Sequence, residues 1–282
     1  MKGSTKVAKI SPFKERLYVL IGCIPMITVM AISLFLVYED YALNNFTYFG
    51  KSWHMSNVEK TTYDSNVPCV DSDYLADRSK YPSCASKQCF RYFTDFLITQ
   101  NEGTILLKLA KKGWALGDDN DSVSNLNIET GFVNRGDSSV KIDKDLITKE
   151  ELDTYENVKE KILNHVKTKF NIKDVYLTNQ NIFSKYTSQE SKSTKLEYWH
   201  TQVDKYVQEW TQYSVVLFLN DYMSEFYGGR YFLHNTDNKT VVTIQPKLAR
   251  LLVYSPGSEN KQHFERLVYG NSYLLRIPLT CN

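Results

Sequence analysis

Residues 198–233 read YWHTQVDKYVQEWTQYSVVLFLNDYMSEFYGGRYFL, and this stretch decides the fold. Its centre, residues 213–219, is β-branched and aromatic, as strands are, and Asn220-Asp221 ends the run. Gly228-Gly229 and, further on, Pro256-Gly257 mark turns between short apolar runs. Short strands at regular spacing with turns between them predict an antiparallel sandwich or jelly roll, not a parallel sheet.

Several short motifs in residues 197–281 carry a family resemblance, namely EYWH, VDK, YSVVLFLNDY, FYGGRYF, SENK and the closing TC. Together they resemble the catalytic core of prolyl 4-hydroxylase-type dioxygenases, which use Fe(II) and 2-oxoglutarate. The resemblance continues more thinly back to about Cys69. It implies an α+β fold, a double-stranded β-helix or jelly roll buttressed by N-terminal helices. For an active enzyme it implies Fe(II) and 2-oxoglutarate, with ascorbate as an optional addition.

The resemblance also implies where the metal ligands would stand. Members of the family hold iron with two His and one carboxylate, and the His-x-Asp part of that set falls on Gln202-Val203-Asp204. The second His falls on Gln262, and the basic residue that clamps 2-oxoglutarate falls on Ser272. Neutral amides are weak iron ligands, and serine cannot form the charge-assisted contact to a carboxylate. Of these four positions, only Asp204 carries the residue type that the resemblance implies.

Nearby residues leave open an alternative with relocated ligands, in which His200 and His263 join Asp204 on the iron. His200 lies two residues before Gln202 and would share its face on an extended strand. His263 follows Gln262 and would need a β-bulge to point inward. The structural interpretations are a polar rim residue for His200 and a surface residue for His263, and we favour both.

The co-substrate has two candidate ligands. Arg276 is in phase with Ser272 along a strand and could replace the lost anchor, although a structural ion pair is the simpler role. Tyr213 resembles a family residue that lines the 2-oxoglutarate pocket, and packing is its simpler role.

Three functions follow from these assignments. We expect a catalytically degenerate protein that needs no cofactor and uses the fold as a binding module. The alternative is an active Fe(II)/2-oxoglutarate dioxygenase that hydroxylates a protein side chain. A third class is a glycan-binding module that uses Trp199 and Trp210 as stacking platforms, although no spacing singles it out. A net charge of +2 gives no general attraction to nucleic acid.

The N-terminal segment predicts a membrane anchor. Residues 1–16 are basic, and residues 17–38 are apolar and long enough to cross a bilayer. Glu39 and Asp40 follow, so the basic end should face the cytoplasm. We expect a type II protein of the endoplasmic reticulum or Golgi, with a lumenal stem at residues 39–92 and the dioxygenase-fold domain at residues 93–282. A cleaved signal peptide is the alternative.

In that compartment the cysteines outside the anchor form an even set, which predicts two disulfides among Cys69, Cys84, Cys89 and Cys281. Three pairings are possible, and we favour one that ties Cys281 back to the stem. Glycosylation sequons, expected to be used in the same compartment, begin at Asn45, Asn120 and Asn238. The partner expected besides the membrane is a lumenal protein or peptide, and no nucleic acid.

Two helices should precede the main strands. Thr99 with Glu102 and Thr148 with Glu151 have capping-box spacing. In the second helix the inward face should comprise Leu152, Tyr155, Val158, Ile162, Val166 and Phe170, and Lys159, Lys161, Lys167 and Lys169 should face water. Residues 44–82 should be an extended connector and residues 187–195 a mobile loop over the cleft. The acidic run at residues 118–121 lacks EF-hand spacing, so we expect a turn there and no calcium.

Overall fold

The structure is a computed structural model that describes residues 28–35, 61–115, 121–135, 138–191, 197–237 and 241–281. The chain divides into two compact units, Met1–Trp53 and His54–Asn282. In the first unit residues 28–35 are helical. Within the described ranges no helix has the length and apolarity needed to span a membrane. The remainder of the predicted anchor, residues 17–27 and 36–38, lies outside these ranges.

The second unit is built on two main β-sheets. The large sheet has the order β1-β2-β12-β8-β14-β7-β3-β4-β5, with β9 paired to β14, and the small sheet has the order β11-β10-β13. Each ladder between the described strands is antiparallel, as predicted. The strands of the large sheet are β1 (Thr62–Val67), β2 (Cys89–Thr94), β3 (Val123–Asn127), β4 (Phe132–Arg135), β5 (Ser138–Lys141), β7 (Ile182–Thr187), β8 (Ser214–Phe218), β9 (Phe226–Tyr227), β12 (Leu251–Tyr254) and β14 (Tyr269–Arg276). Those outside it are β10 (Tyr231–His234), β11 (Val241–Ile244), β13 (Lys261–Phe264), and the pair β6 (Val175–Leu177) and β15 (Leu279–Cys281).

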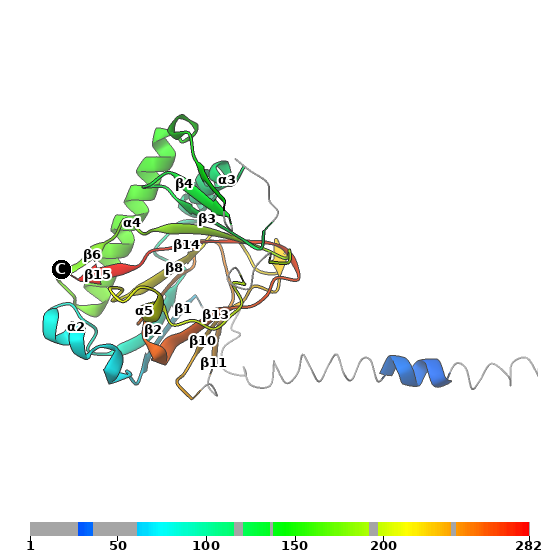
Figure 1. Cartoon of the computed structure of the whole chain (residues 1–282), viewed down its shortest axis with the longest axis horizontal. Helices are drawn as coiled ribbons and strands as arrows, with labels where there is room; N and C mark the ends of the chain where they lie inside the picture. Colours follow the sequence, from blue (N-terminus) through cyan, green and yellow to red (C-terminus); the bar gives the residue numbers. More distant parts are fainter. Residues whose placement is uncertain are drawn as a thin grey trace, which may run out of the picture. The chain divides into compact units, whose positions relative to one another are not determined.

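The strands separate two hydrophobic cores. Along β8 the side chains alternate, so that Val215 and Leu217 join the core shared with the helices. Val216 and Phe218 join the second core, where they meet Tyr231 from the small sheet. In Figure 1 the helices α3 (Gln100–Trp114) and α4 (Lys149–Phe170) and the small sheet accordingly lie on different sides of β8 and β14. The second core fills the space between the large and the small sheet.

The helices α3 (Gln100–Trp114) and α4 (Lys149–Phe170) pack against the large sheet (Figure 1). Both predicted capping boxes are present. The predicted inward face of α4 is confirmed except at its first residue, Leu152, which is 38% exposed. The prediction that Lys159 faces water is wrong. Its side chain runs over the Tyr155 ring and its Nζ lies 3.1 Å from Oε1 of Glu129, so the aliphatic stem is buried.

The folded unit begins earlier than predicted. β1 forms one edge of the large sheet and pairs with β2, which in turn pairs with β12. The predicted boundary at residues 92 and 93 therefore falls inside β2, and the connector prediction is wrong from Thr62 onward. The segment between β1 and β2 contains the short helices η1 (Asp71–Asp73) and α2 (Leu75–Lys80). No alternation of apolar residues marks β1, whose side chains are exposed or half-buried.

Two disulfides are present, as predicted, and they decide between the possible pairings. Cys84 pairs with Cys281 and so ties the last strand to the segment before β2. Cys69 pairs with Cys89 at a Cα–Cα distance of 5.1 Å. The sequon asparagines 45, 120 and 238, residues 118–120 of the acidic run and residues 192–195 of the predicted cleft loop lie outside the described residues.

Candidate functional site

The two glutamines at the expected histidine positions lie opposite each other. Gln202 and Gln262 form an antiparallel bridge, and each backbone N–H donates to the other residue's carbonyl at 2.8 Å. Directly opposed residues of an antiparallel pair project their side chains to the same side. The fold therefore assembles these positions as the resemblance implies, but with amides in place of imidazoles. Asp204 follows at the first residue of α5 (Asp204–Val207).

The carboxylate of Asp204 accepts hydrogen bonds at both oxygens. Ser214 Oγ and Tyr254 Oη each donate to Oδ2 at 2.6 Å, and Gln262 Nε2 lies 3.4 Å from Oδ1. Because Tyr254 gives its only hydroxyl proton to Asp204, Tyr231 Oη must donate to Tyr254 Oη, 2.7 Å away. Burial, followed by the charge of Asp204, raises the pKa of Tyr254 far above its usual value, so Tyr254 stays a donor.

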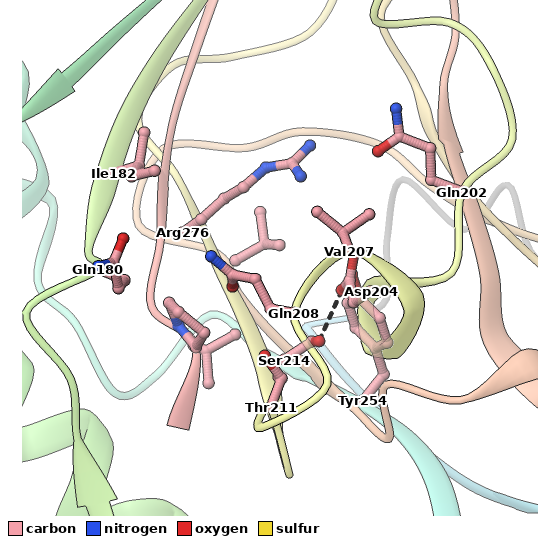
Figure 2. Close-up of a pocket in the computed structure, with 13 residues that line it drawn as sticks. Gln180, Ile182, Gln202, Asp204, Val207, Gln208, Thr211, Ser214, Tyr254 and Arg276 are labelled. Atoms are coloured by element: carbon pink, nitrogen blue, oxygen red, sulfur yellow. Dashed lines mark hydrogen bonds between the residues drawn. The ribbon is translucent and has the colours of Figure 1, made fainter. Parts of the chain in front are cut away.

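A cavity of about 160 Å³ adjoins Asp204 (Figure 2). Arg276 extends into it from the end of β14 in the direction of Gln202, and Nη2 of Arg276 donates to Tyr186 Oη at 2.9 Å. Burial alone would lower the pKa of Arg276, but Tyr186, Tyr231, Asp204 and Tyr254 together raise it, so the guanidinium is charged. A neighbouring cavity of about 230 Å³ shares Ile182, Gln202 and Arg276 with the first.

The interior position expected to anchor 2-oxoglutarate carries no cation. Ser272 is fully buried on β14, and its Oγ has no hydrogen-bond partner within the described structure. Along the same face, Leu274 packs in the second core with Phe218 and Tyr186. A carboxylate at this depth would be desolvated against apolar and aromatic side chains with no opposite charge.

The relocated histidines do not converge on Asp204. His200 has a 58% exposed side chain, and its Nε2 lies 2.5 Å from Oε2 of Glu197. In β13 the register to β10 is continuous through Gln262 and His263, without the bulge that an inward His263 requires. His263 therefore faces the other side of the small sheet, where its ring stacks on Phe232 at 4.6 Å.

Tyr213 also lies away from the cavity. It belongs to the core shared with the helices, and its hydroxyl donates to the carbonyl oxygen of Cys84 at 2.7 Å. The cause is the alternation of β8, because Ser214, the next residue, is the one that faces Asp204. Among the candidates taken from the sequence, the structure brings Asp204, Gln202, Gln262 and Arg276 to one place.

Five polar residues that line the cavity were not found from the sequence: Gln180, Gln208, Thr211, Ser214 and Tyr254. Ser214 had a usable signal, since it occupies the in-phase position of a strand that was correctly predicted. Tyr254 had none, because it comes from β12, fifty residues after Asp204, and only the pairing of β12 with β8 brings it near.

The residues present do not fit an Fe(II) and 2-oxoglutarate centre. Within the described ranges no group of three or more His, Cys, Asp or Glu side chains is placed to hold a metal ion. The carboxylate that remains is already engaged by neutral donors, and the interior anchor position is a serine. Neither the two histidine ligands of the metal nor the co-substrate's counter-charge is supplied at the expected positions.

The glycan-binding alternative gains no specific support. The guanidinium of Arg266 lies over the Trp199 ring, 4.8 Å from its centroid. That face of the ring is therefore covered, whereas a stacking platform needs a free aromatic face. Trp210 is 37% exposed.

Comparison with known proteins identifies the family. No family model matches the chain. The mouse (Mus musculus) protein called 2-oxoglutarate and iron-dependent oxygenase domain-containing protein 3 is 32% identical over 226 residues, which are 77% of this chain and 70% of the mouse protein. The Xenopus tropicalis protein of the same name is 32% identical over 227 residues, with the same coverage, and the human one is 31% identical, covering 77% of this chain and 69% of its own. The chain belongs to this family.

Membership of the 2-oxoglutarate and iron-dependent oxygenase domain-containing protein 3 family confirms the resemblance seen in the motifs. Among solved structures, a prolyl hydroxylase from Trichoplax adhaerens aligns at a TM-score of 0.49 and 13% identity, over 74% of this chain and 89% of its own. A Pseudomonas putida prolyl-4-hydroxylase aligns at 0.45 and 13%, over 74% of this chain and 97% of its own.

Proposed function

We propose that this chain is a non-catalytic member of its family, in which the dioxygenase fold serves as a binding module. The observation that carries the proposal is the state of Asp204, whose carboxylate accepts hydrogen bonds from Ser214, Tyr254 and Gln262. Three donors satisfy a carboxylate without any cation. A metal ion would have to displace them and would then find amides at both neighbouring positions.

The pattern of substitution supports loss of chemistry with retention of the fold. Gln202, Gln262 and Ser272 stand at three positions of one site, while the strands that carry them keep their pairing. Changes scattered at positions of no importance would not empty a single centre so selectively. The pocket is therefore proposed to bind a partner or ligand and not to oxidise it.

The proposal is tested by anaerobic titration of the purified full-length chain with Fe(II) in the presence of 2-oxoglutarate. We expect no saturable binding in the micromolar range. Micromolar binding that is lost in the variants His200→Ala and His263→Ala would overturn the proposal in favour of the alternative, an active dioxygenase with relocated ligands.

A companion experiment restores the expected ligands with Gln202→His, Gln262→His and Ser272→Arg. We expect the restored chain, and not the natural one, to bind Fe(II) and to convert 2-oxoglutarate to succinate without a second substrate. The matched control adds imidazoles at two exposed positions, Gln88→His and Gln189→His, and should remain inactive. Turnover by the natural chain would contradict the proposal.

We further propose that the chain is a single-pass type II protein of the endoplasmic reticulum or Golgi, with the folded unit in the lumen. The apolar run at residues 17–38 and the two disulfides support this location, because disulfides form and persist in oxidising compartments. Protease protection of the folded unit in sealed microsomes is the expected result. Digestion of that unit without detergent would place it on the cytoplasmic side.

A further inference from the structure

Four of the described residues carry large apolar side chains that are at least 70% exposed, more than any other of that kind: Phe96, Met223, Val268 and Tyr269. Tyr227, 49% exposed, lies opposite Tyr269 in the ladder of β9 and β14, and its carbonyl oxygen accepts from the Val268 N–H at 2.9 Å. The Met223 N–H donates to the carbonyl oxygen of Phe226, also at 2.9 Å, so Met223 lies beside β9. Met223, Tyr227, Val268 and Tyr269 therefore form one surface, here called the Tyr269 patch. Single exposed apolar residues are ordinary, but an exposed cluster marks a surface that another molecule covers.

The strand register places this patch at the end of the large sheet where the chain enters it. Thr62, the first residue of β1, pairs with Thr94 of β2, and the same row continues through β12 and β8 to Leu275 of β14. Phe96 follows the end of β2 in this row, and the patch lies at the first residues of β14, beyond the same row. The Thr62 end of the sheet therefore carries all four of the most exposed apolar side chains.

The length of chain before Thr62 bears on what covers this end. Residues 39–61 join the proposed membrane anchor, residues 17–38, to β1. Fully extended, a chain of this length spans at most about 80 Å. The folded unit is thus tethered close to a bilayer, where a high effective concentration makes even a weak contact count. Because the tether is attached at the Thr62 end, this end reaches the bilayer with the shortest chain.

The side chains at this end suit the surface of a bilayer. Tyrosine has an apolar ring and a polar hydroxyl, and it is enriched where a membrane meets water. The nearby charges are mixed, because Lys247 and Arg250 pair with Asp95 at 2.9 and 2.7 Å, and the acidic Asp221 and Glu225 lie in the loop before β9. Such a mixture gives no strong attraction to anionic headgroups. Apolar contact is therefore the expected driving force.

We propose that the Thr62 end of the roll, through the Tyr269 patch and Phe96, docks on the surface of the bilayer in which the chain is anchored. The inference rests on the proposed membrane anchor and extends it, because it gives the folded unit an orientation. Tyr254 pairs with Ser214 near the other end of the sheet, and both donate to Asp204. Asp204 then lies at the end of the sheet away from the lipid.

The experiment incorporates the full-length chain, through its own N-terminal segment, into phosphatidylcholine nanodiscs. Val268→Cys carries a nitroxide label, and Cys23→Ser removes the one cysteine outside the two disulfides. Electron paramagnetic resonance compares the collision rate of the label with oxygen, which concentrates in lipid, and with a nickel chelate, which stays in water. The matched control is the same label at Leu75→Cys, since Leu75 is 65% exposed and lies on α2, beyond the other end of β1.

The ratio of oxygen to nickel collisions should be at least about threefold higher at residue 268 than at residue 75. Added phosphatidylserine should not change it. Replacing the opposed pair, Tyr227→Ser with Tyr269→Ser, should lower the ratio at residue 268 to the value at residue 75, whereas Leu75→Ser should leave it unchanged. These side chains are exposed, so the melting temperature should not fall.

The outcomes keep the two proposals apart. Equal ratios at residues 268 and 75, in a chain that co-elutes with the nanodiscs, would overturn this inference and leave the proposed anchor standing. Low collision rates with both reagents at residue 268 would mean that protein, either a second copy or another chain, covers the patch, and would also overturn it. A chain that does not co-elute with the nanodiscs would overturn the anchor and this inference together.

Discussion

Asp204 carries its carboxylate beside a cavity, at the position where the motif resemblance implies a metal ligand. Asp204 is half-buried, and a carboxylate that is partly removed from water is stabilised by an opposite charge or by several hydrogen-bond donors. Here Ser214 and Tyr254 both donate at 2.6 Å, and Tyr231 supports Tyr254 from behind. The donors come from β8, β12 and β10, so the arrangement depends on both sheets of the roll.

His263 provides a test at the scale of one residue. Burial, and after it the neighbouring His234, lowers the pKa of His263 from 6.5 to about 4, while Glu265 acts weakly in the opposite sense. The unfolded chain therefore binds a proton between pH 6.5 and 4 that the folded chain does not. The free energy of unfolding should fall by roughly 3 kcal/mol as the pH drops through this window, and should change little from this group above it.

The measurement is urea unfolding at several pH values for the natural chain and for His263→Asn, whose amide keeps a hydrogen-bonding atom near the Nδ1 position. The loss of stability between pH 6.5 and 4 should be clearly smaller in the variant. His200→Asn is the matched control for replacing a histidine by an asparagine, at a side chain that is 58% exposed. A natural chain with equal stability at pH 6.5 and 4.5 would contradict the prediction.

The residues of the site were predictable where a strand pattern or a family motif named them. Gln202, Asp204 and Gln262 fell into place because a motif fixes their spacing and the bridge between two of them follows from the roll. Tyr213 was misassigned, because a resemblance names a position without giving the face of the strand. Because side chains alternate along β8, Tyr213 points into the core shared with the helices and Ser214 points towards Asp204.

At the scale of elements, α3 depends on a local device at its first residues. The Thr99 hydroxyl accepts from the N–H of Glu102, and the Glu102 carboxylate accepts from the N–H of Thr99. Thr99→Ala should lower the free energy of unfolding by about 1 kcal/mol, because a backbone N–H at the start of the helix loses its partner. Equilibrium unfolding in urea measures the loss.

Thr104 of the same helix is the matched control. It is exposed, and its hydroxyl donates to the Gln100 carbonyl, which already belongs to the helix. Thr104→Ala should be neutral or slightly stabilising, because alanine has the higher helix propensity. If Thr104→Ala were as damaging as Thr99→Ala, helix content in general, and not the cap, would be the cause.

The elements that sequence reasoning found are those whose signal is local. Capping boxes and the apolar stripe of α4 lie within one helix, and residues 215–218 of β8 are a continuous apolar run. β1 was missed because it is an edge strand with polar side chains, and only its backbone pairing with β2 makes it part of the sheet. Lys159 was misassigned because its partner Glu129 lies in a distant loop.

At the scale of the whole molecule, the two disulfides close loops of very different size. The sequence predicted that the four cysteines would pair and left the pairing open, because spacing alone does not say which ends of the chain meet. The fold decides it, since β15 ends beside β6 and brings Cys281 to Cys84, 197 residues earlier. Cys69 and Cys89 are only 20 residues apart and flank the segment that turns from β1 into β2.

This difference predicts unequal costs when the disulfides are removed. By loop-closure entropy, Cys84→Ser with Cys281→Ser should lower the free energy of unfolding by about 5 kcal/mol, and Cys69→Ser with Cys89→Ser by about 3 kcal/mol, because the longer loop leaves the unfolded chain more freedom. Each pair is replaced together so that no free thiol remains to exchange. Urea unfolding of the three proteins measures both losses, and a larger loss for the short loop would mean that native contacts around Cys69, and not the entropy of the unfolded chain, set the contribution.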